Sequence, residues 1–142
     1  ERSIELTDMK AFKDKPVDTL SGGQRQRAFL SLALAQDAKT LLLDEPTTFL
    51  DLRYQLQFLD LLKKINQEQE ISIVTVIHDL NLAARYCDRI AVLKDGELLA
   101  IDKPREVLTE ELMKQAFQVE TCQIETPIGL QICTIKSDSL DK

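Results

Sequence analysis

Two adjacent carboxylates follow a short apolar run of the sequence. Asp44 and Glu45 come directly after residues 40–43, a run typical of a parallel strand covered on both faces. Ligands of open α/β sheets bind at the carboxyl ends of strands, and neighbouring strand residues point to opposite faces. One carboxylate can therefore hold Mg²⁺, usually through water, while the other orients and polarises an attacking water. The alternative is a solvated acidic pair that merely ends a strand.

A second candidate lies at the start of a predicted helix. Ser21 and Gln24 have the spacing of a capping box, in which side chains satisfy free N–H groups of the first turn. Between them, Gly22 and Gly23 lack the side chains that would keep a phosphate away from the backbone. Helix N-termini attract anions, and the Ser21 hydroxyl adds a donor. An ordinary capped helix is the alternative, but it rarely needs two consecutive glycines there.

Two further polar residues lie close to predicted strands. His78, the only histidine, comes directly after the apolar run at 71–77, where an imidazole could donate to a phosphate oxygen or orient a water. A histidine with a purely structural role is the alternative. Asp51 follows the segment 47–50 and either caps the next helix or contributes to the site near Glu45.

These residues need a scaffold of alternating helices and strands. The stretch 28–35 is apolar nearly all round, so the helix that starts at Ser21 should be buried. The helix predicted over residues 50–67 carries Leu52, Leu56, Leu59 and Leu62 on one stripe. Alternation of strands and helices predicts an α/β fold with a largely parallel sheet. The remaining elements expected are strands at 89–93 and 97–101, helices at 80–86, 104–108 and 110–117, and a hairpin at 119–124 and 130–135.

Bulk composition excludes several classes of protein. The 142 residues suit one domain, and the net charge of −6 argues against a nucleic-acid partner. No apolar run approaches the ~20 residues needed to cross a bilayer, so no direct membrane insertion is expected. The three cysteines fit neither a zinc site nor a disulfide framework and should be free thiols. Only residues 137–142 have the composition of a disordered end.

The order and spacing of the motifs are more specific than any one of them. Leu-Ser-Gly-Gly-Gln-Arg-Gln-Arg at 20–27, Leu-Leu-Leu-Asp-Glu-Pro at 41–46, Leu-Asp at 50–51 and His-Asp at 78–79 closely resemble the nucleotide-binding subunit of ABC transporters. The resemblance runs from about residue 1 to 117. It implies an α/β fold with an incomplete P-loop NTPase (RecA-like) parallel sheet and flanking helices. Residues 1–38 would end the helical subdomain, and 39–142 would form the later part of the ATPase core with its hairpin.

The same resemblance implies a role for each matching residue. Ser21, Gly22, Gly23 and Gln24 match the signature motif, which closes over ATP held by the opposite protomer. In the Walker B strand Asp44 would face Mg²⁺, and Glu45 would be the catalytic glutamate.

Two other positions match loops of the family. Asp51 matches the D-loop, which crosses the dimer interface, and His78 matches the switch histidine. The cofactors implied are ATP and Mg²⁺.

A narrower likeness concerns the importers. Asp-Glu-Pro-Thr-Thr-Phe-Leu-Asp at 44–51 and residues 80–88 are similar to import ATPases for iron–siderophore complexes, haem and cobalamin. The partners implied are a second ATPase subunit in a homodimer, an integral-membrane permease and a substrate-binding protein. The implied location is peripheral, at the cytoplasmic face of the cell membrane.

One family element has no counterpart. The four glycines are Gly22, Gly23, Gly96 and Gly129, from which no Gly-x-x-x-x-Gly-Lys-[Ser/Thr] phosphate loop can be built. Because the sequence begins with Glu1, in what reads as a helix already under way, we expect that loop upstream. This chain by itself should then neither bind ATP tightly nor hydrolyse it. An unpaired sheet edge should also favour association with another chain.

Two other functions compete with an importer subunit. A soluble ABC ATPase of translation or DNA repair can carry similar motifs, but Arg25-Gln26-Arg27, the acidic balance and the absence of a long heptad segment disfavour it. A non-catalytic regulatory or scaffold fragment is the third possibility. It predicts that the complete gene encodes no phosphate loop.

Overall fold

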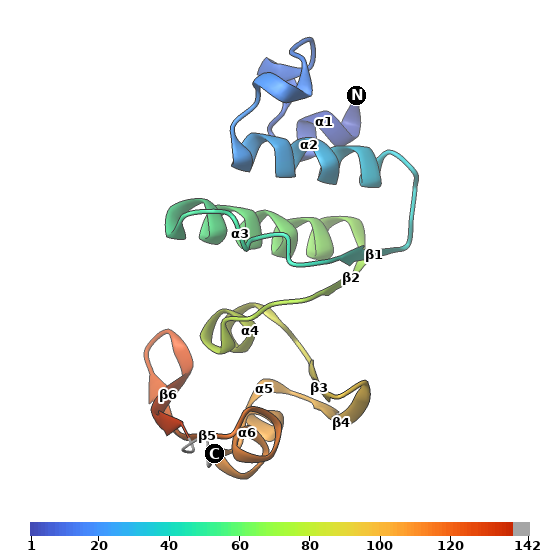
Figure 1. Cartoon of the computed structure of the whole chain (residues 1–142). Coiled ribbons are helices and arrows are strands. Elements are labelled where there is room, and N and C mark those ends of the chain that lie inside the picture. Colours follow the sequence, from blue (N-terminus) through green and yellow to red (C-terminus); the bar gives the residue numbers. More distant parts are fainter. Residues whose placement is uncertain (138–142) are drawn as a thin grey trace. The chain divides into compact units, whose positions relative to one another are not determined.

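The computed structural model describes residues 1–137, and the chain divides into two compact units (Figure 1). The first unit is Glu1–Val76, and the second begins at Ile77. The boundary predicted between residues 38 and 39 was drawn from the sequence motifs, whereas these two units are defined by compactness. That boundary stays a prediction. The disordered end predicted for 137–142 lies, apart from Ser137, outside the described residues.

The first unit contains the helices and strands that carry most of the candidate residues. α2 packs against α1, and α3 contacts both α2 and β2 (Figure 1). The predicted helices and strands are confirmed to within a few residues, whereas the short 3-10 turns η1 and η2 were not predicted. Their bounds are α1 Arg2–Leu6, η1 Lys10–Phe12, η2 Val17–Thr19, α2 Gly22–Leu34, β1 Thr40–Leu43, α3 Leu52–Gln69 and β2 Ser72–Thr75.

β1 and β2 form a parallel pair that fixes where the carboxylates emerge. Thr40 pairs with Ser72 and Leu43 with Thr75, and the Val76 N–H donates to the Leu43 carbonyl at 3.0 Å. The parallel arrangement was predicted, but full coverage of the strand was wrong. Leu41 is 4% exposed while Leu42 is 78% exposed, because successive side chains point to opposite faces and only one face is buried.

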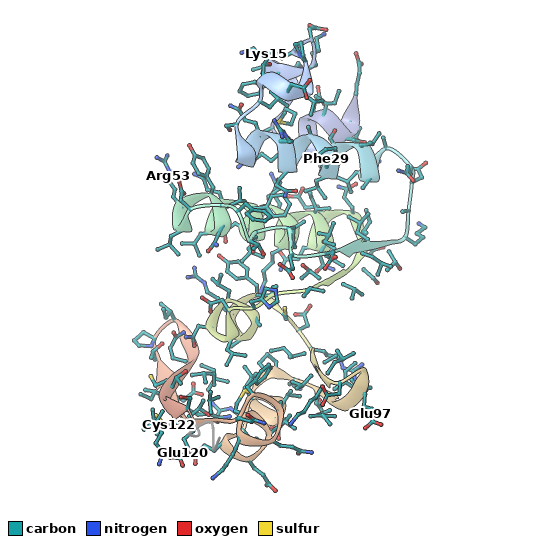
Figure 2. The ribbon with its side chains drawn as sticks, viewed as in Figure 1. Lys15, Phe29, Arg53, Glu97, Glu120 and Cys122 are labelled. Atoms are coloured by element: carbon teal, nitrogen blue, oxygen red, sulfur yellow. The ribbon has the colours of Figure 1, made fainter. Side chains whose placement is uncertain are left out.

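The burial predicted for α2 is also wrong in part. Leu30 and Leu34 are buried, whereas Phe29, labelled in Figure 2, is 53% exposed and Leu32 is 63% exposed. The neighbouring helices cover only part of the circumference of α2, and an apolar sequence cannot say how much of a helix its neighbours will cover.

α3 supplies much of the core of the first unit. Leu59 and Leu62 of the predicted stripe are buried, but Leu52 is 67% exposed because it begins the helix at one end of the core. The buried residues of α3 are Phe58, Leu59, Leu61, Leu62 and Ile65.

The second unit has its own core beneath two hairpins. In the first hairpin, Asp95 and Gly96 both have positive φ, at 50° and 83°, as expected for a type I′ turn. Asn81 ties α4 to β6, since it accepts from the Ile132 N–H at 2.6 Å and donates to the Ile132 carbonyl at 3.2 Å. The core residues are Val92, Val107, Leu108, Met113 and Ile132. Element bounds are α4 Leu80–Tyr86, β3 Ile90–Lys94, β4 Glu97–Asp102, α5 Pro104–Val107, α6 Glu110–Phe117, β5 Val119–Thr126 and β6 Gly129–Ser137.

The last hairpin confirms the predictions made for the tail. Thr126 pairs with Gly129, and Cys122, labelled in Figure 2, pairs directly with Cys133. The register shift of this hairpin lies at Glu120–Thr121, so Cys122 and Cys133 remain directly opposite each other. Both are free thiols, and the α/β class of the chain is confirmed. Across residues 1–137 no helix is long and apolar enough to cross a membrane.

Truncation of the α3 core should destabilise the first unit strongly. Ile65 is 1% exposed, so Ile65→Ala removes fully buried methyl groups and should lower the free energy of unfolding by about 2–5 kcal/mol. Denaturant unfolding followed by circular dichroism measures this. Leu32→Ala on α2, at a side chain 63% exposed, is the control, and its effect should stay within about 0.5 kcal/mol. Equal losses in both variants would contradict the assigned core.

Candidate active site

The carboxylate pair stands at the carboxyl end of β1, where the sequence placed it. Asp44 is exposed and Glu45 is half-buried. Glu45 has φ +44°, in the left-handed region that is uncommon for residues other than glycine. The other residues with positive φ follow helices or occupy a hairpin turn, where such angles are ordinary, whereas Glu45 directly follows a strand. Holding it there costs about 1–3 kcal/mol, which makes a function for its side chain a reasonable hypothesis.

A hydrogen-bonded turn after Glu45 holds this geometry. The Thr48 N–H donates to the Glu45 carbonyl at 3.3 Å, and the Thr48 hydroxyl donates to Glu45 Oε2 at 3.0 Å. The carbonyl of buried Thr47 accepts from the Leu50 N–H at 3.1 Å and from Gln55 Nε2 at 3.1 Å. The carboxylate is therefore oriented by its own loop, and α3 braces that loop.

Asp51 caps α3. Its Oδ1 accepts from the Tyr54 N–H at 3.2 Å, which satisfies one of the free donors at the helix start. The capping role, one of the two readings of Asp51, is thus confirmed. Its implied place at a dimer interface stays a prediction.

The capping box at the start of α2 is formed in full. The Ser21 Oγ accepts from the Gln24 N–H at 3.4 Å, and Gln24 Oε1 accepts from the Ser21 N–H at 3.0 Å. In both bonds the side-chain oxygen is the acceptor. The Ser21 O–H proton therefore stays available as a donor. Gly22 and Gly23 lie in the first turn, where N–H groups have no partner within the helix. This helix start can therefore offer backbone N–H groups and a hydroxyl to an anion.

The signature-type helix start and the carboxylate loop are neighbours in the first unit. A Cβ placed on Gly22 would lie 3.8 Å from Leu50 Cδ2, and one on Gly23 would lie 3.5 Å from Tyr54 Cδ1. Leu50 was predicted as the start of a helix and as part of a loop motif, and Tyr54 was not singled out. No local pattern could have found this contact, because the two segments are far apart in the sequence.

His78 belongs to the second unit, at whose start it lies exposed. The next residue, Asp79, caps α4 by accepting from the N–H groups of Asn81 and Leu82 at 2.8 and 3.0 Å. The helix predicted to follow His78 is thus confirmed. The predicted role of His78 beside Glu45 stays a prediction.

The carboxylates at this site suit a Mg²⁺ ion that is held chiefly by the phosphate oxygens of a bound nucleotide. Within the described part of the chain, no three histidine, cysteine or acidic residues gather into a metal-holding group. Mg²⁺ is usually bound by one or two carboxylates together with phosphate oxygens and water rather than by an all-protein cage. The exposed Asp44 carboxylate at the strand end fits that pattern.

Comparisons with known proteins show which family of proteins the chain resembles. Residues 1–48 match the family model described as ABC transporter. The chain is 45% identical over 135 residues to the petrobactin import ATP-binding protein FpuD of Bacillus anthracis, covering 94% of this chain and 49% of that protein. It is 45% identical over 125 residues to the iron(3+)-hydroxamate import ATP-binding protein FhuC of Bacillus subtilis, covering 88% and 46% respectively.

A solved structure shows the same fold. The dimeric, post-hydrolysis structure of the ATP-binding cassette MJ0796, bound to ADP and Pi, matches with a TM-score of 0.62 and 37% identity. The match covers 73% of this chain and 45% of that one. The chain spans about half the length of the curated relatives it matches. Its fold is therefore that of part of an ABC ATPase domain, as the motifs implied.

Removal of the Ser21 cap should weaken the start of α2. Ser21→Ala deletes the acceptor of the Gln24 N–H and should cost about 1 kcal/mol of stability. Ser21→Asn keeps a capping oxygen and is the control, with an expected loss of only a few tenths of a kcal/mol. Chemical denaturation of the three proteins measures the difference. The cap has no stabilising role if Ser21→Ala and Ser21→Asn unfold at the same denaturant concentration.

Proposed function

We propose that this chain is part of the ATP-binding, ATP-hydrolysing subunit of an ABC importer, and that it carries the carboxylates and the signature motif of that subunit. The observation that carries the proposal is the oriented Glu45 at the end of a parallel strand, beside a capped helix start with two glycines. Similarity to import ATP-binding proteins over most of the chain supports it.

Each site residue has a distinct part in this proposal. Glu45 orients and polarises the attacking water, and the hydrogen bond from the Thr48 hydroxyl fixes the direction of its carboxylate. Asp44 binds Mg²⁺, which neutralises phosphate charge when it is present. His78, which comes after β2 in the chain, is assigned to the phosphate or to the attacking water.

The signature segment acts on a second nucleotide. Ser21, Gly22 and Gly23 offer a hydroxyl and backbone N–H groups to the phosphates of ATP bound by the partner subunit. Gln24 holds Ser21 in place through the capping box. Asp51 keeps the adjoining loop at the dimer interface. The dimeric assembly of the MJ0796 cassette supports a homodimer.

The cargo class is proposed from the relatives. Their names specify petrobactin and iron(3+)-hydroxamate import, and the Thr-Thr-Phe-Leu-Asp segment at 47–51 resembles the same group. We therefore assign the longer protein to import of an iron complex of the siderophore type, with haem and cobalamin as related cargoes. A permease and a substrate-binding protein would complete the transporter at the cytoplasmic face of the membrane.

Glu45→Gln should nearly abolish turnover in the longer protein. A positioned general base contributes roughly 10²–10⁴-fold, so steady-state ATP hydrolysis should fall by that factor, while the affinity for a fluorescent ATP analogue is retained. Glu68→Gln, at an exposed residue of α3, is the matched control and should hydrolyse ATP at the parent rate. A fall of only a few-fold in Glu45→Gln would remove Glu45 from its assigned role.

The 142-residue chain alone should be inactive. It contains no Gly-x-x-x-x-Gly-Lys-[Ser/Thr] segment, so the backbone cradle and lysine that hold the β- and γ-phosphates are not supplied by its own sequence. Phosphate release from the purified chain with Mg²⁺ and millimolar ATP should stay at the buffer blank. Hydrolysis above the blank that Glu45→Gln removes would show that this chain suffices.

A further inference from the structure

The glycine pair at the start of α2 rests on two side chains from the loop and helix that follow Glu45. The nearest neighbour of Gly22 is Leu50, whose Cδ2 lies 3.8 Å from the position of an added Cβ. At Gly23, the Tyr54 ring and its Cβ occupy the same direction, at 3.5, 3.6 and 3.8 Å. Both glycines therefore face these side chains, which lie at van der Waals distance from where a Cβ would stand.

These side chains are anchored to the carboxylate loop. Tyr54 lies next to Arg53, labelled in Figure 2, in the first turn of α3, and its N–H donates to Asp51. Gln55 Nε2 donates to the Thr47 carbonyl, which also accepts from the Leu50 N–H. Thr48 in the same loop donates to the Glu45 carboxylate. A short series of packed and hydrogen-bonded groups thus joins Glu45 to Gly23 within one chain.

We propose that Tyr54, supported by Leu50, is a positioning residue that sets the signature glycines relative to the Glu45 loop. This rests on the proposed function, in which Glu45 serves the subunit's own ATP and Gly22–Gly23 serves the ATP of the partner. The Tyr54 contact then links the two ATP sites of a dimer through each subunit. Tyr54 touches neither nucleotide in this account and acts only through the glycines.

The ring and Cβ of Tyr54, rather than its hydroxyl, face Gly23, because Cδ1, Cγ and Cβ are the atoms nearest to where a Cβ of Gly23 would stand. Tyr54 is 46% exposed, so its ring is only partly committed to the core. A residue kept merely for packing could be truncated with a small, uniform loss of stability. Truncation of a positioning residue should instead change how the dimer responds to ATP concentration. Phenylalanine at position 54 should preserve that response, because it keeps the ring.

The first test uses the longer protein and varies ATP concentration. Tyr54→Ala should raise the ATP concentration for half-maximal hydrolysis about three- to tenfold, since substitutions in coupling contacts change interaction energies modestly. The rate at saturating ATP should change less than about twofold, because Glu45 and its Thr48 bond are intact. Tyr54→Phe should behave as the parent. Phe117→Ala, at a ring 49% exposed on α6, is the matched control and should also behave as the parent.

The second test does not depend on activity. Hydrogen exchange of the 142-residue chain should speed up in Tyr54→Ala at the amides of Gln24 and Arg25, which donate to Ser21, with the buried part of α3 unchanged. Tyr54→Leu, which keeps an apolar side chain, should give an intermediate rate and serves if Tyr54→Ala folds poorly. Tyr54→Phe and Phe117→Ala should leave these amides unchanged.

The outcomes separate the two proposals. An inactive parent protein would overturn the proposed function, while the exchange experiment would still decide the contact. An active parent with the same ATP dependence in Tyr54→Ala and Phe117→Ala would overturn the positioning role alone. Unchanged exchange at Gln24 and Arg25 in both Tyr54→Ala and Tyr54→Leu would overturn it as well.

Discussion

The turn from β1 into α3 is the constraint on which the candidate site depends. The chain must leave a parallel strand and enter a helix that packs against its partner strand β2, so its direction changes sharply after Asp44. The turn is achieved with Glu45 in the left-handed region and with the Thr47 carbonyl accepting two hydrogen bonds. The strain is balanced by bonds inside the loop, and the carboxylate that results is already oriented.

The start of α2 is also stabilised by residues close together in the sequence. A helix start needs its N–H groups satisfied, yet an anion site needs some of them left for a ligand. The reciprocal Ser21–Gln24 bonds satisfy two backbone groups, and the two glycines keep the rest of the turn open. The side-chain bonds thus stabilise the turn, while the anion affinity proposed for it rests on other atoms, its backbone N–H groups.

Features set by neighbouring residues in the sequence could be predicted. The Ser21 and Asp51 caps, the Asp95-Gly96 turn and the final hairpin each follow from short-range chemistry. Burial could not be predicted in the same way, as the exposed faces of Phe29 and Leu42 show. Whether an apolar side chain is covered depends on what packs over it, and the contact of Tyr54 with Gly23 depends on the fold in the same manner.

The order of motifs in the chain has a structural reason within the first unit. The signature helix and the carboxylate strand are consecutive elements, and α3 follows directly, so one helix start can contact both. Asp51 and Tyr54 lie together at the start of α3: the Asp51 carboxylate accepts from the Tyr54 N–H, while the Tyr54 ring faces Gly23. A displacement of the Glu45 loop must therefore move the surface beneath the glycines, because both are built on the same few residues.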